Sequence, residues 1–457
     1  MTTTSFKMNR HFIASLFLAT TFMVISLGAC QKGATPVVTK VNPSSYSSEV
    51  LDKWMTLQLR LMRNATGIAN HAFSRYFAYS GVTAIEALRP GLHGQFSQWT
   101  NKWNGLSGLP TPDHSKDYYY PANVNAGMAA INKAFFPNAS AVDKAAIDSL
   151  EAALNAEFHL TRPQAVINSS SEFGKAVAIA VFNWSETDGY KNANNPYTIP
   201  TGAGLWKPTA PAFANPATPY WGNNRNIISG SINNTHCVSP IVYSTEPASE
   251  FYQMVKEVYD ASQNLTNDQK AMAMFWRDVP GVSSPGHWLS ILQQVIKQTR
   301  SDLTQAALAY ALTGTATNDA LITCFRAKYQ HSLVRPITYI REVMGYTTWN
   351  SMLGTPAHPE YVSAHSSLSM AAARVMENLF GNVSNFTDHT YDYLGFAPRS
   401  YSSLSAIGVE AGLSRLYAGI HYRQSIVAGL QQGEKVADNI FDKHNTEGDT
   451  IGKESAR

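Results

Sequence analysis

The chain has 457 residues, of which 44% are hydrophobic and 15% are charged, and its formal net charge is +3. These proportions are typical of a globular protein with a sizeable core, built as two or three domains or as one large helical body. The chain carries no long run of lysine or arginine, so the sequence argues against a nucleic-acid partner.

The N-terminus has the pattern of a signal peptide. Lys7 and Arg10 precede an apolar stretch over residues 12–25, and small residues follow up to Cys30. The Leu-Gly-Ala-Cys ending resembles the lipobox of bacterial lipoproteins, which implies removal of residues 1–29 and lipidation of Cys30. We therefore expect an exported bacterial lipoprotein that faces the periplasm or the cell surface and is held at the membrane by its lipid anchor only. The alternative is an ordinary signal peptide or an anchor helix. No later stretch has 18 or more consecutive apolar residues.

Residues 30–48 are polar with proline and serine, and we interpret them as a tether. From residue 49 onward, apolar residues recur every three or four positions, which predicts helices. The same pattern occurs at 126–136, 141–158 and 171–190. Residues 191–243 are instead rich in proline, glycine and asparagine, so we expect a long irregular loop of a kind that is often functional.

Helical periodicity resumes at residues 249–263 and continues, with interruptions, to residue 444. Alternating strand patterns are not convincing anywhere, so we predict an all-α fold. It divides into an N-terminal helical region with the loop, residues 49–245, and a second helical region, residues 246–445. Cys237 and Cys324 are the cysteines that remain after Cys30, and their spacing is compatible with a disulfide or with two free thiols.

Two basic residues open the C-terminal third. Lys328 and Arg335 are seven residues apart, and Pro336 follows. Seven residues are close to two helical turns, so we expect both cations on one face of a helix that Pro336 ends.

The triplet Ser363-Ala364-His365 directly precedes an alanine-rich apolar run that predicts a buried helix. Unpaired N–H groups and a partial positive charge make a helix N-terminus a natural place for an oxyanion. The plainer alternative is that Ser363 only caps the helix and that His365 is a surface residue.

Arg415 and His421 are six residues apart, which is about 240° around a straight helix, so on one helix they would not face a common ligand. Gly419 lies between them and is expected to break the helix and turn the chain back. Ser425 is four residues after His421 and within reach of a hydrogen bond on the next helix.

Lys-x6-Arg-Pro, then Ser-x-His, then Ser-Arg-x5-His resembles the pattern of vanadium-dependent haloperoxidases and type 2 phosphatidic acid phosphatases. The resemblance implies their helical bundle and an oxyanion site for vanadate or phosphate. In it, His365 would be the general acid–base and His421 the axial group, which ligates vanadium in the haloperoxidases and attacks phosphorus in the phosphatases. The groups that would hold the oxyanion are Lys328, Arg335, Arg415, Ser363 and the backbone N–H of Ala364.

This chain departs from the pattern at two positions. Ala364 replaces a glycine, which would strain the chain if the position required a positive φ. Ser425 stands where the family often has an aspartate that orients the axial histidine. His358, five residues before Ser363, would line the halide side of the site, where a histidine is typical of members limited to bromide or iodide. The alternative is that His358 merely begins the turn at Pro359.

The resemblance extends to the segments 204–211, 275–278 and 285–288, in which we expect Trp276, His287 and Trp288 to be core residues. The long N-terminal half and the lack of membrane spans favour a vanadium-dependent haloperoxidase, with vanadate as cofactor and with hydrogen peroxide and iodide or bromide as substrates. The alternative is an acid phosphatase that cleaves phosphate esters through a phosphohistidine. A third possibility is a non-catalytic, glycan-binding surface lipoprotein, which would leave the three cations and two histidines unexplained.

Overall fold

The computed structural model describes residues 41–92, 102–278 and 283–445. The predicted signal peptide, Cys30 and the first part of the tether lie outside the described residues. Among the described residues, no helix combines the length and apolar character that crossing a bilayer requires.

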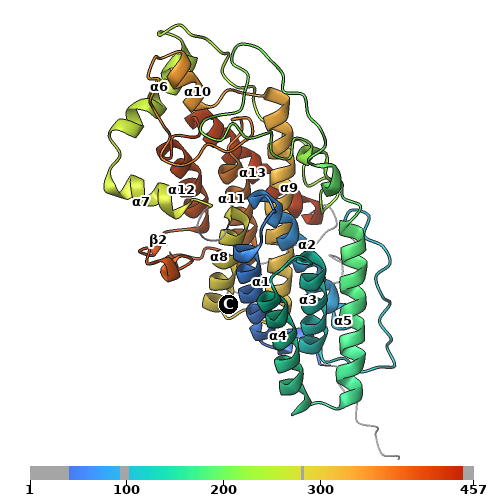
Figure 1. The fold of residues 1–457 in the computed structure, drawn as a ribbon. Helices are drawn as coiled ribbons and strands as arrows, with labels where there is room; N and C mark the ends of the chain where they lie inside the picture. Colours follow the sequence, from blue (N-terminus) through green and yellow to red (C-terminus); the bar gives the residue numbers. More distant parts are fainter. Residues whose placement is uncertain (1–40, 93–101, 279–282, 446–457) are drawn as a thin grey trace, which may run out of the picture. The chain divides into compact units, whose positions relative to one another are not determined.

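The described part of the N-terminal region forms five α-helices, as the apolar periodicity predicts. Ser140 begins one of them, because its hydroxyl accepts a hydrogen bond from the N–H of Asp143 at 3.1 Å. One helix, α2, is buried on all sides and packs against α3 and α5 (Figure 1). The five are α1 (Glu49–Asn64), α2 (Phe73–Ala87), α3 (Tyr120–Phe135), α4 (Ala141–His159) and α5 (Gln164–Ser185).

The segment between α5 and α6 is irregular, as predicted, with only the short 3-10 turns Tyr190–Asn192 and Trp221–Asn223. It is nevertheless fixed to the helices. The carboxylate of Asp319 accepts hydrogen bonds from the N–H of Ile227 at 2.9 Å and from the hydroxyl of Ser231 at 2.6 Å. Trp206 is buried, and its backbone N–H donates to the carbonyl of Ser332.

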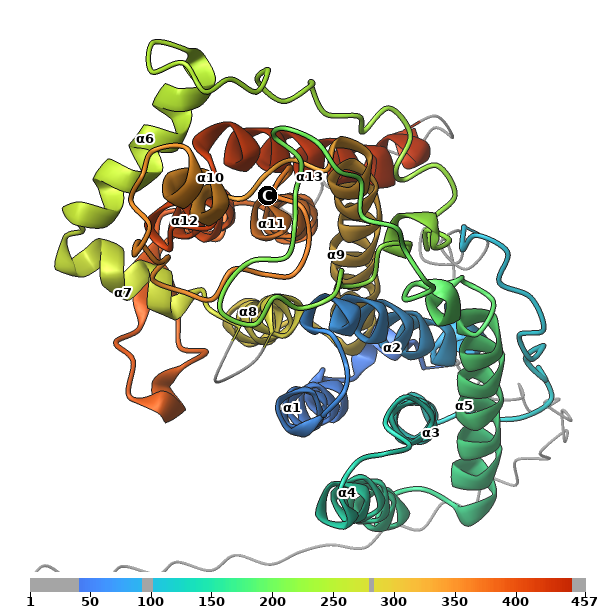
Figure 2. The same cartoon turned by 45° about the horizontal axis from the view of Figure 1, so that its top comes forward.

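The C-terminal region is a bundle in which α11 lies at the centre and contacts α8, α9, α12 and α13 (Figure 2). Gly429 and Gly433 of α13 lie against α11, where a Cβ would collide with the backbone. The helices are α6 (Glu250–Gln263), α7 (Asn267–Phe275), α8 (Ser284–Thr299), α9 (Leu303–His331), α10 (Pro336–Glu342), α11 (Ala364–Phe380), α12 (Leu404–Tyr417) and α13 (Arg423–Asn445).

The two predicted regions meet where α2 packs on α9. A Cβ at Gly81 would lie 2.5 Å from the Cα of Ala311, and a Cβ at Gly314 would lie 2.7 Å from the Cα of Ala78. Glycine at both positions therefore allows the two backbones to touch, and one hydrophobic core spans both helices. The boundary near residue 245 stays a prediction.

The all-α prediction is confirmed, with two local corrections. Two strands, β1 (Phe386–Asp388) and β2 (Arg399–Tyr401), pair antiparallel with Phe386 opposite Tyr401. Three residues are too few to show an alternating pattern. The expectation that Pro336 ends the helix of Lys328 is also wrong, because α9 already ends at His331 and Ser332 adopts a φ of 45°. Pro336 instead begins α10, with Arg335 at its N-cap.

Candidate active site

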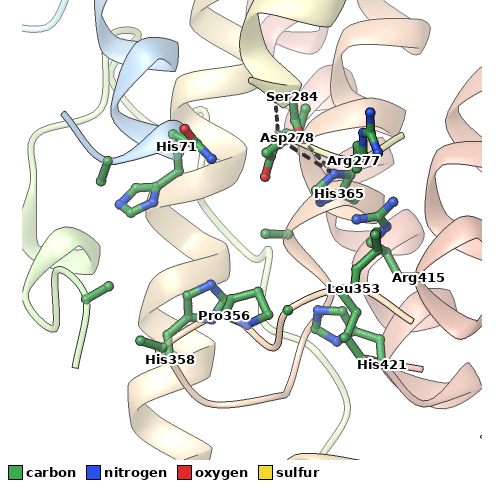
Figure 3. A pocket seen from close by; sticks show the side chains of 18 of the residues that line it. His71, Arg277, Asp278, Ser284, Leu353, Pro356, His358, His365, Arg415 and His421 are labelled. Carbon is green, nitrogen blue, oxygen red and sulfur yellow. Dashed lines mark hydrogen bonds and ion pairs between the residues drawn. The ribbon is translucent and has the colours of Figure 1, made fainter. Parts of the chain in front are cut away.

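A cavity of about 520 Å³ opens where α11 begins and α12 ends (Figure 3). The α7–α8 connection, the loop before α11 and the short turn before α2 complete its walls. Lys328, Arg335 and Ser363 do not line it. Arg335 contacts the lining residue His421, Ser363 directly precedes the lining residue Ala364, and Lys328 donates to the carbonyls of the two residues that follow His358. The predicted site residues in its wall are His358, Ala364, His365, Arg415 and His421.

Arg335 links two histidines of the wall. Its Nη1 lies 3.3 Å from Nε2 of His421, and its Nη2 lies 3.0 Å from Nδ1 of His358. It also donates to the carbonyl of Ile420 at 2.8 Å. Lys328 is fully buried and donates from Nζ to the carbonyls of Pro359 and Glu360. The break between α9 and α10 thus brings both cations to the loop before α11.

The three cations of the motif are buried without carboxylate ion pairs within the described part of the chain. Their hydrogen-bond partners are carbonyl oxygens, one hydroxyl and imidazole nitrogens. Burial lowers the pKa of Lys328 to about 7 and the pKa of both Arg335 and Arg415 to about 10. Buried charge of one sign is costly unless it is neutralised, so this set of residues fits an oxyanion.

His421 lies in the loop between α12 and α13, after Gly419 turns the chain with a φ of 78°. The predicted break is therefore confirmed. Nδ1 of His421 is 2.7 Å from Oε1 of Glu360 but 3.4 Å from the hydroxyl of Ser425. Because the carboxylate accepts from Nδ1–H, Nε2 keeps its lone pair, and the hydrogen bond from Arg335 requires the same tautomer.

Glu360 therefore supplies the negative charge that the serine at 425 lacks. Its Oε1 also accepts from the N–H of Tyr422 at 2.9 Å, and its Oε2 is buried without a hydrogen-bond partner. Burial raises the pKa of Glu360 to about 7, although Arg335 and Lys328 oppose this shift.

The start of α11 shows whether the alanine at position 364, where the family pattern has a glycine, strains the backbone. Ser363 caps the helix by accepting from the N–H of Ser366 at 3.3 Å. Ala364 is the first helical residue and does not have a positive φ. The conformational strain that a positive φ would impose on alanine is therefore absent, and residue 364 forms part of the cavity wall. Roles for Ser363 and Ala364 in binding stay predictions.

His365 is not the surface residue of the plainer alternative, because its side chain is only 12% exposed. Its Nε2 lies 2.7 Å from the hydroxyl of Ser284 and 3.0 Å from the carbonyl of Trp276. Asp278 accepts from both the N–H and the hydroxyl of Ser284 and lies 4.0 Å from the imidazole. Burial and the charge of Arg415 lower the pKa of His365 to about 3, while Asp278 opposes this shift.

The wall around His358 is aromatic. The ring of Phe325 lies 5.2 Å from that of His358 and 4.4 Å from that of His71, which comes from the turn before α2. The hydroxyl of Thr218 lies 2.7 Å from Nε2 of His71, within hydrogen-bond distance. Burial lowers the pKa of both imidazoles, so both are neutral near pH 7.

The motifs alone did not identify four residues of this site: His71, Asp278, Ser284 and Glu360. Asp278 belongs to one of the segments that carried the resemblance, and Glu360 stands between His358 and Ser363 in the sequence. An acidic residue in that short stretch was the available signal for Glu360.

Several residues outside the cavity are structural. His287 is buried, stacks on Trp276 at 4.3 Å and pairs with Asp388 at 2.6 Å. Trp288 is buried and donates to the hydroxyl of Ser369. The expectation of core packing is confirmed for all three residues of that prediction. Cys237 and Cys324 are free thiols.

Comparisons with known proteins agree with this arrangement. The family model described as the VCPO second helical-bundle domain matches residues 308–448. The crystal structure of the first bacterial vanadium-dependent iodoperoxidase is 29% identical, with a TM-score of 0.77 over 87% of this chain and 96% of that one. A holo-type bacterial vanadium-dependent chloroperoxidase is 16% identical, with a TM-score of 0.62 over 91% of this chain and 96% of that one, and shares the fold. No relative is found among curated protein sequences.

Proposed function

The chain belongs to the vanadium haloperoxidase superfamily, and we propose that it oxidises iodide and bromide with hydrogen peroxide at a vanadate site. The observation that carries the proposal is that Lys328, Arg335 and Arg415 are buried and have no carboxylate within ion-pair distance among the described residues. Arg335 contacts Nε2 of His421, and Arg415 lines the same cavity as His421. One imidazole with several cations and N–H donors is the donor set of an oxyanion rather than of a bare metal ion.

The residues that would hold vanadate are Lys328, Arg335, Arg415 and the start of α11, and Nε2 of His421 would bind the vanadium. When bound, vanadate would supply the activation of peroxide for transfer of an oxygen atom to halide. The overall reaction, H2O2 + I− + H+ → HOI + H2O, needs a group that takes up a proton and returns it. In His365, Nε2–H donates to the carbonyl of Trp276, so Nδ1 is the nitrogen that can accept that proton.

The preference for iodide and bromide rests on two arguments. His358 belongs to the cavity wall, at the position where the family resemblance implies a histidine in members that do not oxidise chloride. The iodoperoxidase is also the more similar of the two solved haloperoxidases described above.

Acid phosphatase activity is the alternative. The Glu360–His421 pair leaves the Nε2 lone pair available for attack on phosphorus, and the same cations would neutralise a phosphate ester. A non-catalytic, glycan-binding surface lipoprotein gives no role to this pair.

The test is to purify the protein without metal, add vanadate, and measure peroxide-dependent oxidation of iodide, bromide and chloride beside hydrolysis of a phosphate ester. We expect vanadate-dependent oxidation of iodide and bromide that His421→Ala abolishes. Robust chloride oxidation would contradict the halide preference. Vanadate-inhibited hydrolysis without halide oxidation would establish the phosphatase instead.

We also propose that the protein is an exported lipoprotein anchored through Cys30. Cys30→Ser should prevent cleavage by the lipoprotein signal peptidase and abolish partition of the processed protein into the membrane fraction. Unchanged processing and partition in that variant would contradict lipidation at this residue.

A further inference from the structure

Arg277 follows α7 and lines the cavity, drawn near His365 and Arg415 in Figure 3. Its contacts are unusual for a guanidinium. Nη1 points to the thioether sulfur of Met274 at 3.6 Å, and the guanidinium carbon lies 5.3 Å from the centre of the Phe396 ring. Nε is buried and has no hydrogen-bond partner. The charge is thus held by soft, polarisable groups on one side and faces a cavity.

Two other arginines of the described chain show how a carboxylate can neutralise a buried or partly buried guanidinium. Arg75 pairs with Asp188 at 2.6 Å, and Arg399 pairs with Glu410 at 2.7 Å. No carboxylate of the described residues lies within ion-pair distance of Arg277, and residues 279–282 are Val-Pro-Gly-Val in sequence. Asp278 follows Arg277 in the chain, but its Oδ1 accepts two hydrogen bonds from Ser284 and does not pair with the guanidinium.

Arg277 lines the cavity, and no carboxylate of the described residues neutralises it, so its partly buried charge is costly unless an anion enters the cavity beside it. Arg277 is also additional to the three cations that the motif places around His421. It lies near His365 in the view of Figure 3, whereas His358 and His71 are drawn across the cavity.

The surroundings select among anions. Guanidinium is more weakly hydrated than an ammonium group, and a thioether and an aromatic ring offer little replacement for the water of a strongly hydrated ion. A large halide loses less hydration on entry than chloride does, because desolvation costs more for the smaller ion.

We propose that Arg277 binds the halide substrate at the cavity wall and prefers iodide to chloride. This inference rests on the proposed function, because it names a recognition residue for the halide of that reaction. It adds a halide-binding group that is separate from His358 and from the residues that would hold vanadate.

The test compares Arg277→Gln with Arg63→Gln. Arg63 is a matched control, because its guanidinium also lies over an aromatic ring, 4.8 Å from the centre of Tyr393, but it does not line the cavity. We expect Arg277→Gln to raise the KM for iodide roughly 10-fold to 100-fold, as expected for loss of a charge-assisted contact. The KM for peroxide and the affinity for vanadate should change less than about twofold, and Arg63→Gln should leave all three unchanged.

A second measurement does not depend on turnover. Crystals of the vanadate-free protein soaked in iodide should show an anomalous peak beside the guanidinium of Arg277, and crystals of Arg277→Gln should lack it. An unchanged iodide KM, a parallel loss of vanadate affinity or a peak that persists in the variant would overturn the inference. If the loaded protein oxidises no halide, the proposed function fails, and the anomalous peak still decides whether Arg277 binds iodide.

Discussion

Glu360→Gln removes the negative charge that faces the axial histidine while keeping the size of the side chain. In the wild type, Oε1 lies 2.7 Å from Nδ1 of His421 and 2.9 Å from the N–H of Tyr422. A charge-assisted hydrogen bond contributes about 1–2 kcal/mol more than a neutral one. We therefore expect vanadate affinity to fall roughly 5-fold to 30-fold at pH 8, since 1.4 kcal/mol corresponds to a factor of about ten.

The effect should depend on pH in a defined direction. Burial raises the pKa of Glu360 to about 7, so the wild-type carboxyl becomes protonated as pH falls below that value. The difference between wild type and variant should therefore be complete at pH 8 and small near pH 5.5. Calorimetric titration with vanadate at both values measures it. Nitrogen-15 NMR of the His421 ring should show a weaker Nδ1–H hydrogen bond in the variant, while the hydrogen bond from Arg335 to Nε2 keeps the Nδ1–H tautomer.

Ser425→Ala is the matched control, because that hydroxyl is 3.4 Å from the same nitrogen and 3.5 Å from the carbonyl of Glu360. Contacts of this length are weak, so we expect a change in vanadate affinity below about threefold. Wild-type affinity in Glu360→Gln at pH 8, or an equal loss in Ser425→Ala, would refute the assignment of Glu360 as the residue that positions His421.

Three further changes test other parts of the structure. Asp278→Asn removes a charge that raises the pKa of His365, so the acidic limb of the pH–rate profile should move to lower pH; an upward shift would contradict the geometry. Burial raises the pKa of Glu86 from 4.5 to about 7, so the folded state retains a proton there and stability falls as pH rises through that window. Glu86→Gln keeps an acceptor for Trp103 and should raise the free energy of unfolding by about 1–3 kcal/mol at pH 8 but little at pH 4.5, as thermal melts at both values would show. Gly81→Ala should destabilise the fold by about 1–3 kcal/mol through overpacking, and a urea midpoint equal to that of the wild type would contradict this.

Sequence patterns predicted most of the helices, because each buries one apolar stripe whose period is visible in the chain. The sequence motifs also identified site residues that lie near the end of a helix, such as Ser363, His365 and Arg415. The break after α9 was not predictable, because Ser332 adopts a left-handed conformation without a glycine to mark it. The three-residue strands were too short to show a period.

The missed residues of the site share one property: tertiary contacts between distant segments bring them to it. Glu360 reaches His421 across 61 positions of sequence, and His71 meets Phe325 from the other half of the chain. The periodicity of apolar residues along the chain does not predict contacts between segments so far apart in sequence. A buried carboxylate or imidazole can be recognised as a site residue only when the structure shows which residues surround it.

The glycine contact between α2 and α9 bears on the order in which the chain folds. All fifteen residues of α2 are buried, and α9 begins about 200 residues after α2 ends. At a synthesis rate of about 5–20 residues per second, α2 would wait on the order of 10–40 s for the helix that covers it. We expect chains halted before residue 303 to leave the α9-facing side of this apolar helix uncovered and to need a chaperone for solubility.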